Sequence, residues 1–297
     1  MLRWILNFRG QRRAIGRAYL FDALGRVTPA VAVDTEGLRL HLNTADRMVS
    51  RGIFANGLWE RPMFERMTQE LAARGLDAAL DGKVFLDIGA NIGTASCHAV
   101  SAYGAAQSWA FEPAPENVWF LRQNIVANGL EDRVRLHACA LSDQDGSVAL
   151  ELSDVNAGDH RVRTAAADAS TALLGESKWS TAEVVARRLD GFVEDGTLHL
   201  DRVSLAWIDV QGHEAHVLGG ALALLSSQVP IVCEFWPYGL RRAGGFERFA
   251  EQLAGRRSGF VDLNRPTGEA LPLSALGALA EDLGRPDEAT DLLLLPE

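Results

Sequence analysis

Apolar and polar positions follow two rhythms along this chain, one typical of buried strands and the other of amphipathic helices. From residue 83 onwards, short apolar runs recur, and most are separated by longer stretches with apolar residues at helical spacing. The runs predict strands near 83–88, 107–111, 133–138, 203–209, 229–235, 258–263 and 291–295. The stretches between them predict helices near 92–103, 115–128, 213–225 and 245–255. Because such alternation is typical of α/β proteins, we predict a doubly wound, mostly parallel sheet of seven strands.

The first part of the chain departs from this alternation. Two alternating runs, 31–34 and 38–42, flank the turn sequence Thr35-Glu36-Gly37 and predict a β-hairpin. Helical spacing of apolar residues then continues over 62–76. The predicted division of the chain is a basic helical extension over 1–30, a hairpin-and-helix segment packing on the core over 31–78, and a main domain over 79–297.

Residues 142–202 form an insertion in which no strand–helix unit is evident. Residues 147–152 alternate like an edge strand, whereas 154–180 are rich in Ala, Asp, Ser and Thr and show little periodicity. A loop of this length inside a compact domain is usually either functional or disordered. Two interpretations stay open, a cover over a substrate site and a solvated insertion.

The stretch from Val84 to Thr94 predicts a buried strand, a glycine-rich turn and the start of a helix. Gly89 and Gly93, with Asn91 between them, allow backbone angles that a side chain would forbid and a close approach of the backbone to a ligand. Such a turn, at the carboxyl end of a strand and beside the N–H groups of a helix start, is where open α/β sheets bind nucleotide-like cofactors.

Two carboxylates indicate which cofactor this is. Asp87, at the tip of the strand, would repel a pyrophosphate but suits an ammonium group. Glu112 ends the next apolar run, at about the distance of 20 residues from the glycine turn that is expected of an acid binding ribose hydroxyls. The ligand implied has an amino group, a ribose and no phosphates, a description that S-adenosylmethionine fits and NAD fits less well.

Here the chain resembles the class I methyltransferases, and more narrowly the FkbM-type family. The motifs that carry the resemblance are residues 85–93 (FLDIGANIG), 111–113 (FEP), 140–143 (ALSD), 156–161 (NAGDHR), 208–214 (IDVQGHE) and 234–237 (EFWP). They occur in the family's order and cover roughly residues 50–240. The sequence departs from the family at Gln211, where the family more often has an acid.

The resemblance implies a Rossmann-like sheet whose last strand is antiparallel, and O-methylation of a hydroxyl on a sugar, a glycan or a natural-product scaffold. The residues that it assigns to the cofactor are Asp87, Gly89, Asn91, Gly93 and Glu112, with Ser142 and Asp143 at the adenine and Glu60 near the entrance. A polar hairpin turn is the alternative explanation for Ser142 and Asp143.

Methyl transfer to a hydroxyl requires alignment and a base that takes the proton. Asp209 and Glu234 end two predicted strands, and His213 and Glu214 begin the helix after Asp209, all at the cofactor edge of the sheet. We predict that His213 takes the acceptor's proton and that Asp209 orients it or acts as the base itself. Alternatively, Asp209 only ties down the turn and Glu214 only favours the helix dipole. The three acids could instead bind Mg²⁺, but their spacing does not demand a metal, and we predict none.

Further candidates lie in the insertion and among the tryptophans. His160 and Arg161 predict a base with an anion clamp, with plain surface as the alternative. Trp119, Trp207 and Trp236 could stack on a sugar or base, although core packing explains Trp207 better because it lies within an apolar strand.

Composition excludes some classes of function. The net charge of −10 argues against broad nucleic-acid binding. The cysteines Cys97, Cys139 and Cys233 show no metal-type spacing, and the apolar surroundings of the first and last predict buried free thiols, which suits a cytoplasmic protein. No run is long and apolar enough to span a bilayer. The segment from Arg3 to Arg17 fits either a helix on an anionic membrane surface or, the interpretation we favour, a basic helix that packs on the acidic domain.

We therefore predict a SAM-dependent O-methyltransferase acting on a small-molecule or glycan acceptor, with no particular oligomeric state indicated. Two other classes share some of these features. An NAD-dependent oxidoreductase would have the same glycine turn and ribose acid, and a scaffold or SAM-binding protein would have the fold without the chemistry.

Overall fold

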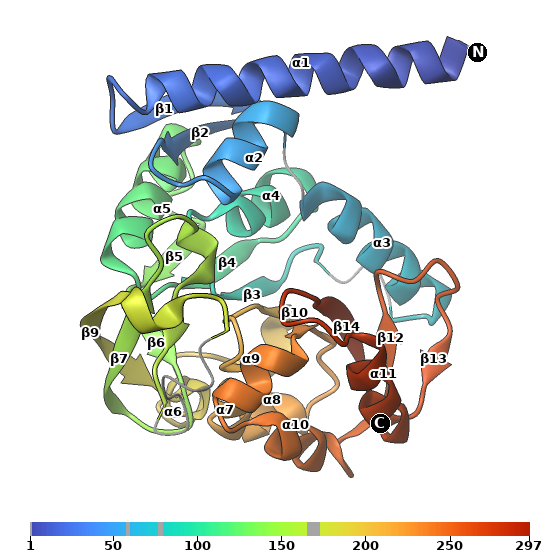
Figure 1. Cartoon of the computed structure of the whole chain (residues 1–297). Coiled ribbons are helices and arrows are strands. Elements are labelled where there is room, and N and C mark those ends of the chain that lie inside the picture. The colour runs from blue at the N-terminus through green and yellow to red at the C-terminus, as the bar shows by residue number, and fades with distance from the viewer. Residues whose placement is uncertain (1, 58–59, 77–79, 165–172) are drawn as a thin grey trace.

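The computed structural model describes residues 2–57, 60–76, 80–164 and 173–297, and leaves out the side chains of residues 2–12 and of Glu60. Its centre is a sheet in the strand order β13-β12-β14-β11-β10-β3-β4-β5 (Figure 1). The strands are β3 (Val84–Ile88), β4 (Gln107–Phe111), β5 (Val134–His137), β10 (Val203–Ile208), β11 (Ile231–Phe235), β12 (Arg257–Asp262), β13 (Ala270–Leu271) and β14 (Thr290–Pro296). This confirms the predicted α/β fold.

Strand directions follow the prediction, and the strand count differs by one. Strands β5, β4, β3, β10 and β11 run parallel, while β14 lies antiparallel between β11 and β12. The eighth strand, β13, is two residues long and pairs with the outer side of β12. So short a strand has no periodicity that a sequence pattern can reveal.

Helices cover both faces of the sheet. They are α4 (Thr94–Ala102), α5 (Pro115–Ala127), α6 (Leu189–Glu194), α7 (Glu214–Gly219), α8 (Leu222–Leu225), α9 (Pro237–Arg242), α10 (Phe246–Leu253) and α11 (Leu276–Asp282). The helix predicted over 213–225 is broken into α7 and α8 at Gly220, where a Cβ atom would lie 2.0 Å from the carbonyl oxygen of Ser142. The short helices α6, α9 and α11 were not predicted.

Side chains alternate along β3 between two hydrophobic cores. Leu86 and Ile88 belong to the core that includes residues of α7, α8, α10 and α11. Phe85 belongs to the core on the other face, which also contains Cys97 of α4 and Leu121 of α5. Because both faces of β3 are covered, its carboxyl end is the part of the strand that can reach a ligand.

The N-terminal part adds α1 (Leu2–Leu24), β1 (Ala30–Thr35), β2 (Leu38–Asn43), α2 (Val49–Asn56) and α3 (Glu60–Ala73). Strands β1 and β2 form an antiparallel hairpin at the predicted place. Two side-chain amides, one in α5 and one on the residue that follows it, fix the hairpin to the main sheet layer, since Asn124 and Asn128 accept the backbone N–H groups of His41 and Arg39. Helix α1 lies at one end of the molecule, where it crosses over the hairpin and α2 (Figure 1). The division into three segments stays a prediction.

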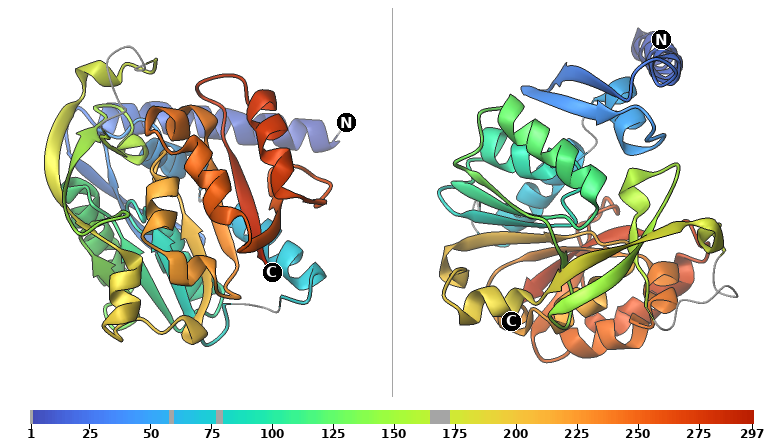
Figure 2. Two further views of the ribbon diagram at one scale, coloured as in Figure 1. Left: turned by 90° about the horizontal axis from the view of Figure 1, so that it is seen from below. Right: turned by 90° about the vertical axis from the view of Figure 1, so that its left-hand side faces the viewer.

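The insertion contains a second sheet, which corrects the expectation of one edge strand and a long loop. Its strands are β6 (Ala140–Leu141), β7 (Gly146–Leu152), β8 (Arg161–Val162) and β9 (Ser180–Arg187), in the order β6-β9-β7-β8. Figure 2 shows this sheet as a separate layer beside the central one. Within the described residues, no helix is long and apolar enough to cross a membrane.

Candidate active site

A cavity of about 270 Å³ opens where β3, β4 and β10 end. Its walls include Gly89, Glu112 and Asp209, each directly after one of these strands. The other wall comes from the insertion, where Asn156 and His160 line the cavity. The candidates from three strand ends therefore meet at one edge, as parallel strands require.

The glycine turn after β3 is shaped by its protein neighbours. Gly89 has φ +92°, and a Cβ atom there would lie 1.8 Å from the carbonyl oxygen of Asp209. Gly93, with φ +84°, begins α4, and its Cβ would lie 2.0 Å from Cδ1 of Leu121. Gly89 and Asn91 line the cavity, whereas Gly93 does not. The prediction that Gly93 touches the cofactor is therefore not supported by its position, since its close neighbour is a helix of the core.

Asp87 and Glu112 are both buried and both line the cavity. Asp87 accepts a hydrogen bond from the Ser96 hydroxyl. Glu112 accepts the backbone N–H groups of Asn91 and Ala114, each at 2.8 Å. Burial raises the pKa of Glu112 to about 7, because desolvation outweighs these hydrogen bonds.

Asp209 and Glu234 form a carboxyl pair where the neighbouring strands β10 and β11 end. The Nε2 atom of Gln211 donates to Asp209 at 2.7 Å and to Glu234 at 3.3 Å. Burial raises the pKa of Asp209, and burial together with the charge of Asp209 raises the pKa of Glu234 well above its usual range. Asp209 lines the cavity and Glu234 stands behind it, so only Asp209 is placed to meet a ligand.

A tight turn holds Asp209 in place. Gln211 has φ +55°, and Gly212 has φ +98°. A Cβ atom on Gly212 would lie 2.6 Å from the backbone of Gly239 in α9. Glu214 closes the turn by accepting the N–H groups of Val210 and Gly212 at 3.1 and 3.0 Å. Glu214 therefore has a structural role in the turn, which the sequence had suggested for Asp209, whereas the alternative predicted for Glu214 was a favourable interaction with the helix dipole.

His213 lines the cavity but is poorly suited to act as a base. Its Nε2 atom lies 3.0 Å from the hydroxyl oxygen of Ser142, and its ring stacks on His216 at 4.3 Å. Burial lowers the pKa of His213 well below its usual value, so the ring is neutral and weakly basic at pH 7.

His160 follows the short 3₁₀ helix η1 (Ala157–Asp159), which lies over the glycine turn. Asn117 of α5 donates to the carbonyl oxygen of Ala157 at 2.9 Å, and Asp46 accepts the N–H group of the same residue. The Nδ1 atom of His160 accepts the N–H group of Ser153 at 3.1 Å, and burial lowers its pKa. The neutral ring therefore carries its proton on Nε2, which makes His160 a hydrogen-bond donor rather than the base that we predicted.

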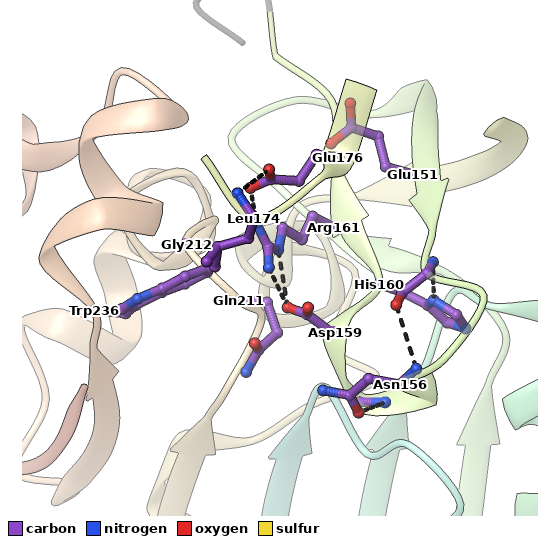
Figure 3. Close-up of polar contacts among 12 residues, drawn as sticks. Glu151, Asn156, Asp159, His160, Arg161, Leu174, Glu176, Gln211, Gly212 and Trp236 are labelled. Atoms are coloured by element: carbon purple, nitrogen blue, oxygen red, sulfur yellow. Dashed lines mark hydrogen bonds and ion pairs between the residues drawn. The ribbon is translucent and has the colours of Figure 1, made fainter. Parts of the chain in front are cut away.

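Arg161 is the centre of a buried ion-pair network (Figure 3). Its guanidinium donates to Asp159 and, at 2.5 Å, to Glu176 of the 3₁₀ helix η2 (Glu176–Lys178). It lies 4.8 Å from the ring centroid of Trp179 and 4.4 Å from that of Trp236. Arg161 is therefore not the anion clamp that we predicted, because its own carboxylates occupy it.

The network also joins the second sheet to the central one. Arg242 of α9 pairs with Glu151 of β7 at 2.8 Å, and Tyr238 of α9 donates to Glu176. These partners lie 60 or more positions apart in the chain. Sequence reasoning missed them, and it also missed Asp46 and Asn117, because none belongs to a local motif.

The adenine assignment for Ser142 and Asp143 is not supported by their positions. Ser142 faces His213, and Asp143 pairs with Arg248 of α10 at 3.0 Å. The lining residues of this segment are instead 139–141. The side chain of Glu60, the first residue of α3, lies outside the described part of the structure.

The structure also shows where the candidate tryptophans and the cysteines lie. Trp207 is buried and lines the cavity, Trp119 is 51% exposed, and Trp236 belongs to the Arg161 network. All three cysteines are buried free thiols, as expected for Cys97 and Cys233. Over the described residues, no group of three or more His, Cys, Asp or Glu side chains is arranged to hold a metal ion.

Comparison with known proteins gives one family. The sequence model described as "Methyltransferase FkbM domain" matches residues 87–251, more than half of the chain. The chain is 31% identical over 160 residues to the 2-O-methyltransferase NoeI of Sinorhizobium fredii, covering 51% of this chain and 63% of that protein. It is 28% identical over 170 residues to the hexuronic acid methyltransferase AglP of Haloferax volcanii, covering 57% and 62%. The matches thus span less than two thirds of either relative.

Solved structures resemble this one more distantly. The methyltransferase FkbM from Methylobacillus flagellatus is 16% identical, with 72% of this chain and 44% of that chain covered and a TM-score of 0.41. TYW2 of P. horikoshii in complex with MeSAdo is 13% identical, with 91% and 72% covered and a TM-score of 0.43. At these scores the likenesses add nothing to an assignment of function.

Proposed function

The chain belongs to the FkbM methyltransferase family, and from that premise we propose that it transfers the methyl group of S-adenosylmethionine to a hydroxyl group of a sugar. The observation that carries the proposal is the cavity, which joins Asp87 and Glu112 on one side to Asp209 on the other. The names of the two relatives, a 2-O-methyltransferase and a hexuronic acid methyltransferase, support a sugar acceptor. Family membership also argues against the oxidoreductase alternative.

Residues on the β3–β4 side fit S-adenosylmethionine. Buried Asp87 provides a negative charge for its ammonium group. The oxygens of Glu112 accept two backbone N–H groups and keep lone pairs for ribose hydroxyls. The Oδ1 atom of Asn91 is buried without a hydrogen-bond partner in the described part of the chain, which leaves a further acceptor for a ligand N–H group. When bound, the cofactor supplies the electrophilic methyl group on its sulfonium.

Asp209 is the group best placed to accept the proton of the acceptor hydroxyl. Asp209 would take the proton that the acceptor hydroxyl loses on methylation, and the bound cofactor would supply the methyl group and leave as S-adenosylhomocysteine. The raised pKa of Asp209 makes this carboxylate a stronger base near neutral pH than an exposed aspartate. His160 positions the acceptor by donating from Nε2, and His213 shapes the wall as a neutral ring.

A methyl-transfer assay tests this function. Purified protein, S-adenosylmethionine and a panel of methyl glycosides should yield S-adenosylhomocysteine and a product heavier by one methylene, measured by mass spectrometry. Asp209→Asn should lower kcat by about 10²-fold or more while the Kd for S-adenosylmethionine stays within about threefold. Full activity of Asp209→Asn would contradict its role as base, and no transfer to any sugar would contradict the acceptor class.

A further inference from the structure

The cavity wall has an unusual charge balance for a site that receives a polar acceptor. Its lining includes the carboxylates of Asp87, Glu112 and Asp209, and within the described residues it includes no lysine or arginine. Of the parts that the structure does not describe, the stretches 58–59, 77–79 and 165–172 contain no lysine or arginine in the sequence, and Arg3, Arg9 and Arg12, whose side chains are left out, belong to α1. A cation for an acidic acceptor would therefore have to come from residues near the wall.

Three arginines adjoin lining residues in the chain, and each lies beside a carboxylate. Arg163, next to Val162, is 2.9 Å from Glu151. Arg161, next to His160, donates to Asp159 and Glu176 and is only 2% exposed (Figure 3). Arg47, next to Met48, lies 3.8 Å from Asp22. Recruiting Arg161 would take the guanidinium from Asp159 and from the fully buried Glu176, which would keep only Tyr238 and the more distant Arg242, and so costs more than the new ion pair would return.

Negative groups, in contrast, converge on the acceptor side. Asp209 and Glu234 share the amide of Gln211, and the charge of Asp159 acts on both. Even with one proton between Asp209 and Glu234, the pair keeps a negative charge that no cation in the described lining offsets. A carboxylate or phosphate group of an acceptor would be buried beside this pair without a cation. The cost of burying that unpaired charge would exclude such an acceptor.

We propose that the acceptor is a sugar without negative charge near the reacting hydroxyl, either a neutral sugar or an amino sugar, and that uronic acids and sugar phosphates are excluded. This inference rests on the proposed function and deepens it. The inference follows from the placement of Asp209, Glu234 and Arg161. The side of the cavity that contains Asp209, here called the acceptor wall, would then select acceptors by their charge.

Matched acceptors provide the experiment. The methyl glycosides of glucose, galactose and mannose are each compared with their uronate, and glucose and galactose also with their 2-amino analogues, at saturating S-adenosylmethionine. For a sugar that is methylated, kcat/KM should exceed that of its uronate by about tenfold or more, as expected for one uncompensated charge contact. Binding of S-adenosylmethionine is measured in parallel by calorimetry.

Met48 allows the charge of the wall to be changed at its exposed rim. This residue lines the cavity, is 54% exposed and has no role in the proposed chemistry. Met48→Arg should lower the preference for the neutral sugar over its uronate at least about threefold, because it adds the missing cation. Met48→Leu is the matched control and should leave the preference unchanged.

The outcomes separate this inference from the proposed function. A uronate methylated as well as its neutral partner overturns the charge filter and leaves the sugar methyltransferase standing. A preference for neutral sugars that Met48→Arg does not alter also overturns it, since shape rather than charge would then select. No transfer to any sugar, or no binding of S-adenosylmethionine, overturns the proposed function and this inference together.

Discussion

The two sides of the cavity are built in different ways. On the β3–β4 side, Asp87, Asn91 and Glu112 come from one strand–turn–helix unit and the strand beside it, and Glu112 accepts the backbone N–H groups of Asn91, in that turn, and of Ala114. On the other side, Asp209 lies at the turn that follows β10 and His160 in the insertion, and the Arg161 network ties the second sheet to α9 through partners up to 91 positions apart in the chain.

This difference separates a local motif from an assembled wall. The cofactor side depends on the backbone geometry of two neighbouring strands and one glycine turn, so sequence motifs reveal it and single backbone substitutions should disrupt it. The acceptor side depends in addition on buried ion pairs between segments that are distant in the chain. Changes there should impair the acceptor while sparing the cofactor, and the four predictions below test that separation.

Gly89→Ala should have the largest effect because Gly89 is where the two sides touch. A Cβ atom there would lie 1.8 Å from the Asp209 carbonyl oxygen, at a φ of +92°. We expect the free energy of unfolding to fall by at least about 4 kcal/mol, with loss of cofactor binding. Denaturant titration measures this, and Gly191→Ala in α6, with no atom within 4 Å of the added Cβ, is the control that should unfold like the unmodified protein. Equal stability of the two variants would contradict the contact.

Arg161→Met should have the second-largest effect on stability. It removes the cation of Asp159 and the nearer of the two cations of the fully buried Glu176, which should cost about 3 to 4 kcal/mol. Protein that remains folded should bind S-adenosylmethionine within about threefold of normal but lose methyl transfer. The control is Arg285→Met, which removes the ion pairs of a side chain that is 69% exposed with Asp287 and Glu288, and should change stability by less than about 1 kcal/mol. Normal turnover in Arg161→Met would show that the network does not support the acceptor wall.

Glu214→Gln tests the pH dependence of the turn after β10. Burial raises the pKa of Glu214 to about 7 from the ordinary 4.5, so the folded state binds more protons than the unfolded state between these values. The free energy of unfolding therefore falls as pH rises from 4.5 to 7, by at most about 3 kcal/mol from this residue.

The glutamine variant should keep the hydrogen bonds to Val210 and Gly212 and show a weaker fall, and it should match or exceed the unmodified protein at pH 8. Denaturant unfolding at pH 5, 6, 7 and 8 measures the slope. Glu65→Gln, whose side chain is 50% exposed, is the control and should leave the slope as it is. Identical slopes for Glu214→Gln and the unmodified protein would contradict the raised pKa of the buried Glu214 carboxyl group.

Ser142→Ala should have the smallest effect on the cofactor. Because the Ser142 hydroxyl faces His213, its removal should change the Kd for S-adenosylmethionine by less than about twofold and stability by about 1 kcal/mol. Calorimetric titration checks the affinity. A tenfold weaker Kd would restore the contact with adenine that the family resemblance implies.

Sequence reasoning succeeded where local pattern determines structure. The apolar runs predicted the strands of the central sheet that flank the cavity, and strand ends predicted that Asp87, Glu112 and Asp209 would meet. It failed where partners are distant. Strand β9 pairs with β7 across about 30 residues, and Arg161 owes its role to Glu176 and Trp236, which no spacing near Arg161 reveals. The sequence also does not distinguish the two glycines of the turn, although Gly89 lines the cavity and Gly93 packs against Leu121.

Calorimetric titration of S-adenosylmethionine into the unmodified protein, Asp87→Asn and Asp209→Asn tests the central claim most directly, with NAD as the control ligand. We predict micromolar binding of S-adenosylmethionine to the unmodified protein, about tenfold or greater weakening in Asp87→Asn, a change within about threefold in Asp209→Asn, and no binding of NAD. Equal weakening in the two folded variants would contradict the separation of cofactor and acceptor sides, and binding of NAD in place of S-adenosylmethionine would contradict the proposed function itself.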